Sequence, residues 1–407
     1  MLCHLRSFSN LPAYCVMTLL SATPLTALAG SDEQAKRIHD RLTGVPPSSS
    51  VLSQMTTLID GGDDVAAALL AMENDAFYNV TLKNFATPWT NEAQTLFAPL
   101  NDYTATVIGM IRDDISFDQL LSADIIYVGD SGLGLPAYSM TNNNHYEQLE
   151  SSGASLKDNL VQASQSNVTG MPSEATAGIV TTRAAAKAFF IAGTNRAMIR
   201  FTLMNHLCTD LEPIKDNTRP PDRIRQDVSR SPGGDSRIFI NACLGCHAGM
   251  DPLAQAYAYY EYEYDSDADP EGENGRLVYN SDGDIDPETG TRVQAKYHIN
   301  SNNFEAGYIT PNDSWDNYWR EGPNSLLGWD GSLSGSGNGA KSLGIELASS
   351  EAFASCQVEK VFETVCLRSP VDSADRSQIS SMVTSFKTNN YNMKRVFAEA
   401  ASYCKGN

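Results

Sequence analysis

Residues 236–254 read SRIFINACLGCHAGMDPLA, and within them Cys243, Cys246 and His247 stand in the order C-x-x-C-H. This spacing is the signature of covalent haem attachment. Two thiols must add to the two vinyl groups of one porphyrin, and the adjacent histidine must reach the iron from the same side. Gly245 keeps the loop free of a side chain where it would lie against the macrocycle. The sequence therefore predicts one haem c, with Cys243 and Cys246 as covalent anchors and His247 as the proximal iron ligand.

Three other interpretations of the same motif are weaker. A zinc site needs a second Cys/His pair at suitable spacing, and the neighbouring sequence offers none. A thioredoxin-like redox pair needs a βαβ context, which the flanking sequence does not predict. A disulfide between Cys243 and Cys246 would leave His247 unexplained.

The residues around the motif resemble class I cytochromes c. Phe239 lies four residues before Cys243, where those proteins place an aromatic ring against the haem edge. The run Met250-Asp251-Pro252-Leu253 is similar to their loop beside the proximal imidazole. This resemblance implies that the Pro252 carbonyl accepts a hydrogen bond from Nδ1 of His247 and fixes its tautomer.

A wider resemblance is to the planctomycete-type secreted cytochrome c proteins, a multi-domain family. Four stretches carry it, with CLGCHAGMDPLAQAYAYYEYEYD the most specific. The resemblance implies secretion and haem binding, and it implies no particular substrate or reaction. The stretches, in the order of the family, are residues 117–130, 178–209, 243–265 and 347–368.

The N-terminus is predicted to be a signal peptide that comprises residues 1–29. Arg6 supplies the positive region, an apolar stretch follows, and Ala27-Leu28-Ala29 has the small residues of a cleavage site. Pro12 and Pro24 interrupt the apolar stretch, and no later segment is long and apolar enough to span a bilayer. We therefore expect a periplasmic or secreted protein without an integral membrane segment in the mature chain.

The chain is strongly acidic, with a formal net charge of −20 over 407 residues. Because no basic patch is visible, nucleic acid is not an expected partner. The acidity is interpreted first as a solvated surface that keeps the protein soluble. The alternative is a docking face for a basic redox partner protein, whose identity the sequence does not give.

Apolar residues recur at three- and four-residue spacing over most of the chain, which predicts a mainly α fold. The longest predicted helix covers residues 181–208, and a short β-branched run at 124–128 is a candidate strand. Residues 265–339 are rich in Asp, Asn, Gly and Ser, and we interpret them as a loop-rich excursion with small hairpins around 277–279 and 293–299. Three further helices are expected at 349–367, 373–385 and 392–403.

These elements suggest two domains. The first is a helical N-terminal domain, residues 30–175. The second is a cytochrome-c-like domain, residues 176–407, which contains the haem motif 243–247, the excursion 265–339 and the C-terminal helices 340–404.

The sixth iron ligand is left open by the sequence. His298 is the candidate we name, because it lies in an excursion dense with aromatic residues that could cover the haem. Met382 and Met393 are alternatives, as is an open or water-bound iron, whereas Met250 is expected to pack beside the proximal ligand. For the other mature histidines we expect structural places: His206 in the core, and His39 and His145 at the surface.

Two acidic runs, Asp265 to Asp269 and Asp282 to Asp286, resemble calcium-binding loops. Pro270 and Pro287 occupy the position at which a calcium loop of the EF-hand type requires glycine, so solvated acidic loops are the favoured interpretation.

Four mature cysteines remain outside the motif, and an oxidising compartment would pair them. Cys356 and Cys366 are ten residues apart in one predicted helix, too far for a disulfide. Three consecutive helices with short connections favour an up-down-up bundle, in which Cys366 and Cys404 lie at the same end. We therefore predict the pair Cys366–Cys404, which leaves Cys208 for Cys356.

Three functions are consistent with the sequence. The leading one is electron transfer by an exported single-haem c-type cytochrome. The alternatives are a haem peroxidase or oxygenase with an open distal site, and a binding module in which the haem is a structural staple.

Overall fold

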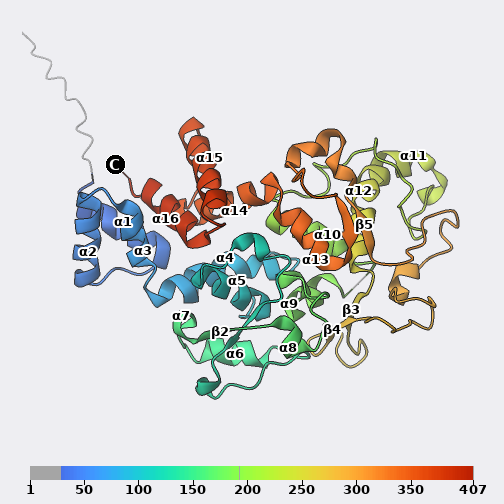
Figure 1. The fold of residues 1–407 in the computed structure, drawn as a ribbon, viewed down its shortest axis with the longest axis horizontal. Helices are drawn as coiled ribbons and strands as arrows, with labels where there is room; N and C mark the ends of the chain where they lie inside the picture. Colours follow the sequence, from blue (N-terminus) through green and yellow to red (C-terminus); the bar gives the residue numbers. More distant parts are fainter. Residues whose placement is uncertain (1–28, 192, 407) are drawn as a thin grey trace, which may run out of the picture.

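The computed structural model describes residues 29–191 and 193–406. The predicted signal peptide, apart from residue 29, lies outside the described residues. The fold is mainly α, as predicted, with 52% helix and 6% strand. The strands form only two-stranded antiparallel sheets between the helices (Figure 1). Among the described residues, no helix combines the length and apolar character needed to cross a bilayer.

The N-terminal part begins with short helices whose ends follow local capping rules. The Oγ of Ser48 accepts a hydrogen bond from the Val51 backbone N–H at the start of the second helix, and Gly44 takes a left-handed φ of 72° after the first. The elements are α1 (Ser31–Thr43), α2 (Ser49–Asp60), α3 (Asp64–Ala71), α4 (Lys83–Ala86), α5 (Asp102–Arg112), α6 (Asn144–Ser151), α7 (Leu156–Asn159) and α8 (Gln165–Thr169), with strand β1 (Ile126–Gly129) paired to β2 (Leu160–Ala163).

The single helix predicted at 181–208 is wrong: the structure has two helices, α9 (Arg183–Phe189) and α10 (Arg196–His206). Gly193 and Asn195 separate them in left-handed conformations, with φ of 62° and 58°. The Asn195 amide donates hydrogen bonds of 3.0 Å to the carbonyls of Tyr257 and Tyr260. These long-range hydrogen bonds stabilise the interruption between the two helices. The helical periodicity of the local sequence does not reveal them.

The motif lies on the next helical segment, formed by α11 (Ser236–Ile238), a π-helical turn at Phe239–Cys243, and α12 (Leu244–Ala254). The excursion follows, with β3 (Tyr260–Glu263) paired to β4 (Arg276–Tyr279) and β5 (Ser314–Asp316) paired to β6 (Ser336–Asn338). The hairpin expected around 277–279 is therefore present, although its first strand precedes the excursion. The one expected around 293–299 is absent, because Ala295–His298 forms a 3₁₀ turn.

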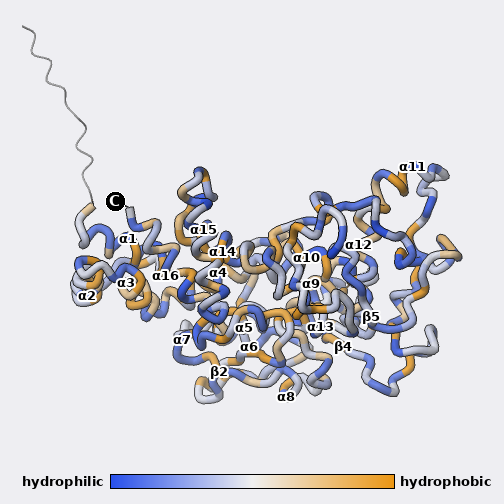
Figure 2. The backbone as a smooth tube through the Cα atoms, turned by 45° about the horizontal axis from the view of Figure 1, so that its top comes forward, coloured by the Kyte–Doolittle hydropathy of each residue, from blue (hydrophilic) through white to orange (hydrophobic). Residues whose placement is uncertain are grey.

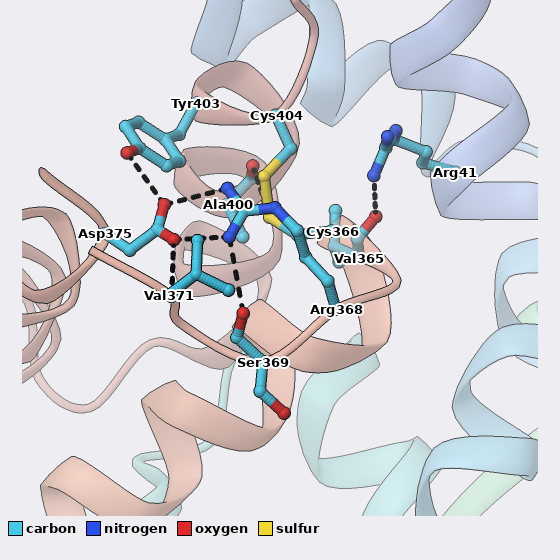
Figure 3. Close-up of a disulfide and its surroundings, with 10 residues drawn as sticks. All are labelled: Arg41, Val365, Cys366, Arg368, Ser369, Val371, Asp375, Ala400, Tyr403 and Cys404. Atoms are coloured by element: carbon cyan, nitrogen blue, oxygen red, sulfur yellow. Dashed lines mark hydrogen bonds and ion pairs between the residues drawn. A yellow bond between two sulfur atoms is a disulfide. The ribbon is translucent and has the colours of Figure 1, made fainter.

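The chain ends in α13 (Gly339–Ala348), α14 (Glu351–Cys366), α15 (Ser373–Thr388) and α16 (Met393–Tyr403). The last three confirm the predicted C-terminal helices. The predicted disulfides are also present: Cys208 pairs with Cys356 and Cys366 with Cys404, at Cα–Cα distances of 5.2 and 5.5 Å. Figure 3 shows the second bridge joining the end of α14 to the end of α16.

The division at residue 175 does not separate two hydrophobic cores. One buried cluster includes Ala35 near the N-terminus, Leu253 on α12 and Phe397 on α16. The C-terminal helix α16 packs on α3 and α1, so the first and last helices lie side by side (Figure 1). Hydrophobic and hydrophilic stretches alternate along these helices in Figure 2, as expected of helices with one buried face. The two parts of the described chain therefore share one large core, beside two small clusters that include Phe239 and Tyr297.

Two histidine assignments need correction. His39 and His145 are buried, with 1% and 4% of their surface exposed, although both were expected at the surface. Each imidazole donates from Nδ1 to a nearby carbonyl: His39 to Val45 at 2.8 Å, and His145 to Pro136 at 2.6 Å. A buried polar ring costs little when a local acceptor satisfies it, and this explains both positions. His206 is buried, as predicted.

Candidate functional site

The segment that carries the motif is a helix with an irregular start. The Asp235 side chain accepts the backbone N–H of Arg237 at 2.9 Å and begins the helix. The π-helical turn then ends at Cys243, and regular α-helix follows. Cys243, Cys246 and His247 are three and four residues apart, so they share one face of this segment. All three side chains are partly exposed, which leaves the face accessible.

The two motif thiols are chemically distinct from the other cysteines. Cys243 and Cys246 are free, whereas the other four cysteines of the described chain are in disulfides. The Sγ of Cys246 lies 3.7 Å from the carbonyl oxygen of Leu211. Burial, followed by the charge of Glu212, raises the pKa of the Cys246 thiol. The motif therefore offers two thiols on one helix face for bond formation.

The imidazole of His247 is oriented by a carboxylate. Its Nδ1 lies 3.0 Å from Oδ1 of Asp251, and because an ionised carboxylate only accepts, Nδ1 must carry the proton. The predicted acceptor, the Pro252 carbonyl, is replaced because α12 continues through Pro252 to Ala254 and places that carbonyl inside the helix. The tautomer leaves the Nε2 lone pair of His247 available for a metal.

Asp251 belongs to a buried ion-pair network. Arg196 donates from Nε to Oδ1 at 2.7 Å and from Nη2 to Oδ2 at 2.8 Å. The same guanidinium makes two further bonds of 2.6 and 2.9 Å to Asp227. Burial alone would raise the pKa of the Asp251 carboxyl, but Arg196 and His247 hold it well below its ordinary value. Asp251 is therefore a buried, ionised acceptor.

Two glycines of the motif region permit close packing by other parts of the chain. A Cβ on Gly245 would lie 2.4 Å from the side-chain oxygen of Asn217, so this glycine faces the 215–217 loop, not the place assigned to a macrocycle. A Cβ on Gly249 would lie 2.0 Å from the indole Nε1 of Trp319. Trp319 is fully buried, and it brings the excursion into contact with α12.

His298 lies in the excursion at the end of the 3₁₀ turn Ala295–His298. Its Nε2 is buried without a hydrogen-bond partner in the described chain. The neighbouring Tyr297 donates from Oη to the Ala254 carbonyl at 2.8 Å, so this turn packs at the C-terminal end of α12. Seven residues of helix, about 10 Å along the axis, separate Ala254 from His247. The turn that carries His298 is therefore anchored through Tyr297 at the end of α12 that lies away from His247.

The methionine candidates are placed differently from one another. Met250 is buried on α12, which agrees with the packing role expected for it. Met382 and Met393 lie on α15 and α16, at the opposite end of the molecule from α12 in Figure 1. The fold therefore does not bring either of these two methionines to the motif.

The acidic runs of the excursion use their carboxylates to close turns. Asp269 accepts the backbone N–H groups of Glu273 and Asn274 at 2.9 and 2.6 Å. Asp286 accepts those of Glu288 and Thr289 at 2.9 and 3.0 Å. Within the described residues, no group of three or more His, Cys, Asp or Glu side chains is arranged to hold a metal ion.

No family model, no curated protein and no solved structure matches this chain. The site must therefore be judged by its own donor set. The site has two free thiols and one imidazole on one accessible helix face. Nδ1 of the imidazole is hydrogen-bonded and Nε2 is available. This donor set fits the requirements of a covalently bound haem. When bound, the haem would be held covalently by Cys243 and Cys246, and Nε2 of His247 would bind its iron.

Sequence reasoning missed Asp251 and Arg196 as parts of the site. A signal for Asp251 was present, because it follows His247 by four residues and so shares its helix face. Arg196 had no comparable signal, since it lies 55 residues from Asp251 and reaches it only through the packing of α10 on α12.

Proposed function

We propose that this protein is an exported c-type cytochrome that carries one covalent haem and transfers electrons outside the cytoplasm, with an as yet unidentified redox partner protein. The observation that supports this best is the pairing of the free thiols of Cys243 and Cys246 with the oriented imidazole of His247. Two disulfides elsewhere in the chain are compatible with an oxidising compartment. The haem would supply a one-electron iron couple, and the chain would fix its position and its axial ligand.

The first experiment tests attachment. Produced with a c-type maturation system, the wild-type protein should keep its haem after denaturation and acid–acetone extraction, because thioether bonds survive both. The Cys243→Ala/Cys246→Ala variant should lose haem staining of the denatured chain. The matched control, Cys366→Ala/Cys404→Ala, also removes two cysteines and should keep the stain. Recovery of free haem from the wild-type protein would contradict the proposal.

A second candidate function is a haem peroxidase or oxygenase with an open sixth position. Helices α15 and α16, which carry Met382 and Met393, lie away from α12, and this favours it because it removes two candidate ligands. Six-coordinate low-spin iron would indicate electron transfer, and a vacant position would indicate catalysis. Absence of reversible reduction would instead indicate the third function, a binding module in which haem is a structural staple.

The sixth ligand itself is tested at His298. We keep His298 as the proposed distal ligand, supported by its buried Nε2, which has no hydrogen-bond partner among the described residues. The His298→Ala variant should then change from low-spin to high-spin iron and bind azide or imidazole. His145→Ala is the control, since His145 is satisfied by Gly129 and Pro136. An unchanged low-spin spectrum for His298→Ala would exclude His298 and require another ligand, whereas high-spin iron already in the wild-type protein would indicate an open position.

A further inference from the structure

The acceptor on Nδ1 of His247 is unusual in its charge and in how it is held. Asp251 is fully buried. Its carboxylate accepts a hydrogen bond from Nδ1 of His247 at 3.0 Å and two from the guanidinium of Arg196 at 2.7 and 2.8 Å. The Arg225 backbone N–H points at the same carboxylate from 3.4 Å. The aspartate side chain is therefore fixed by donors on α10 and on the loop before the motif.

A second carboxylate weakens the electrostatic attraction between Arg196 and Asp251. Asp227 takes two hydrogen bonds from the same guanidinium, at 2.6 and 2.9 Å. The guanidinium is thus shared between two acids, and its charge is not directed at Asp251 alone. The other cations that face this pair are Arg225, whose side chain turns to Thr194, and Arg230.

The chemical consequence follows from the nature of the acceptor. A carboxylate accepts a hydrogen bond more strongly than a neutral carbonyl does, and it draws the Nδ1 proton away from the ring. The imidazole then becomes a more basic ligand through Nε2. A more basic axial ligand stabilises the ferric state, because the higher charge gains more from a stronger donor.

We propose that Asp251 is a positioning residue that lowers the midpoint potential of the haem iron through His247, and that Arg196 and Asp227 set the strength of this effect. The inference rests on the proposed function, because it requires haem on His247. The three residues would thus tune the potential of the iron, and the carboxylate of Asp251 would lower it.

The experiment is a redox titration of haem-loaded variants. Asp251→Asn keeps the size of the side chain and replaces the carboxylate by a neutral amide. The ratio of reduced to oxidised haem at a fixed solution potential should rise at least tenfold, which corresponds to about 59 mV for a one-electron couple. In the His298→Ala background, which removes the proposed sixth ligand and leaves the ferrous iron five-coordinate, Asp251→Asn should move the iron–histidine stretching band to lower frequency, which loss of packing alone would not cause.

Asp227→Asn is the matched control. It removes the same charge from the same network but leaves the bond between His247 and Asp251 in place. Its shift in potential should be less than half that of Asp251→Asn. Equal shifts in the two variants would overturn the proposal, since charge alone would then account for them.

Arg196→Lys gives a test with the opposite sign, and it remains informative if Asp251→Asn fails to fold. Lysine keeps the positive charge but cannot reproduce the two-pronged bond, so Asp251 should accept more strongly from His247 and the potential should fall. An unchanged or higher potential would overturn the proposal. If wild-type protein carries no covalent haem, the proposed function itself fails, and that outcome is seen by staining before any potential is measured.

Discussion

At the scale of single residues, His206 shows how burial controls charge. Its Nε2 lies 2.8 Å from the Tyr103 hydroxyl, and its ring packs edge-on against Trp89. Burial, and next the charge of Lys360, holds the pKa of His206 well below 6.5. The same burial lowers the pKa of Lys360 to about 7. The fold therefore favours the neutral imidazole.

This arrangement predicts a pH dependence of stability. Below pH 6.5 the unfolded chain binds a proton at His206 that the folded chain does not, so the free energy of unfolding must decrease as the pH falls. The contribution is about 1.4 kcal/mol per pH unit for this one group. Urea unfolding of wild type and His206→Gln between pH 7 and 5 measures it. The variant should show the shallower dependence, and equal slopes would contradict the prediction.

The residues of the motif could be predicted because their chemistry fixes their spacing along the chain. Cys243, Cys246 and His247 must be neighbours in sequence to hold one porphyrin. Arg196 could not be predicted in the same way, because its buried salt bridge to Asp251 forms only when α10 packs against α12 with these two residues opposite each other. His39 and His145 were misplaced for a related reason, since the carbonyl that satisfies each ring becomes an acceptor only in the folded chain.

At the scale of elements, the helices were predictable where the apolar periodicity and the capping residues at the helix ends indicated the same bounds. Helix α14 begins where the Ser350 side chain accepts the Phe353 backbone N–H, and it ends at Leu367 with a left-handed φ of 57°. The predicted bundle geometry also gave the two disulfide pairs. Where prediction failed, as between α9 and α10, a distant side chain of the folded protein stabilises a local break.

The disulfide between α10 and α14 should contribute more stability than the one between α14 and α16. Cys208 and Cys356 are 148 residues apart, and Cys366 and Cys404 are 38 apart. The entropy of loop closure in the unfolded chain gives about 5 kcal/mol for the first and about 4 kcal/mol for the second. Serine replacement of each pair, followed by urea unfolding, should reproduce this order. An unchanged midpoint for the Cys208/Cys356 variant would contradict the prediction.

At the scale of the whole molecule, the packing of the first and last helices determines whether the chain is one domain or two. Helix α3 packs on α16, and α1 packs on both α14 and α16. Two arginines of α1 reinforce its packing. Arg37 donates to the Lys405 carbonyl at 2.7 Å, and Arg41 donates to the Val365 carbonyl at 2.8 Å, the latter visible in Figure 3. The order of the predicted elements suggested a boundary at residue 175, but that order does not reveal that the two ends of the chain share a core.

This shared core predicts the behaviour of a nicked protein. Ser173 and Glu174 are exposed, so a protease recognition sequence inserted between them would be cleaved without disturbing buried contacts. Both disulfides lie on the C-terminal side of this cut, so no covalent bond would join the fragments. We nevertheless expect them to stay together.

The helices on the two sides of the cut form one continuous apolar cluster, from Ala35 on α1 to Ala401 on α16, and separation would expose it to water. After cleavage, size-exclusion chromatography under native conditions should give one peak at the position of the intact protein, while denaturing electrophoresis shows two bands. The intact chain with the same insertion, left uncleaved, is the control. Two separate native peaks would mean that the contacts of α3 with α16 and of α1 with α14 are too weak to join the halves, and that the chain is divided at residue 175 after all.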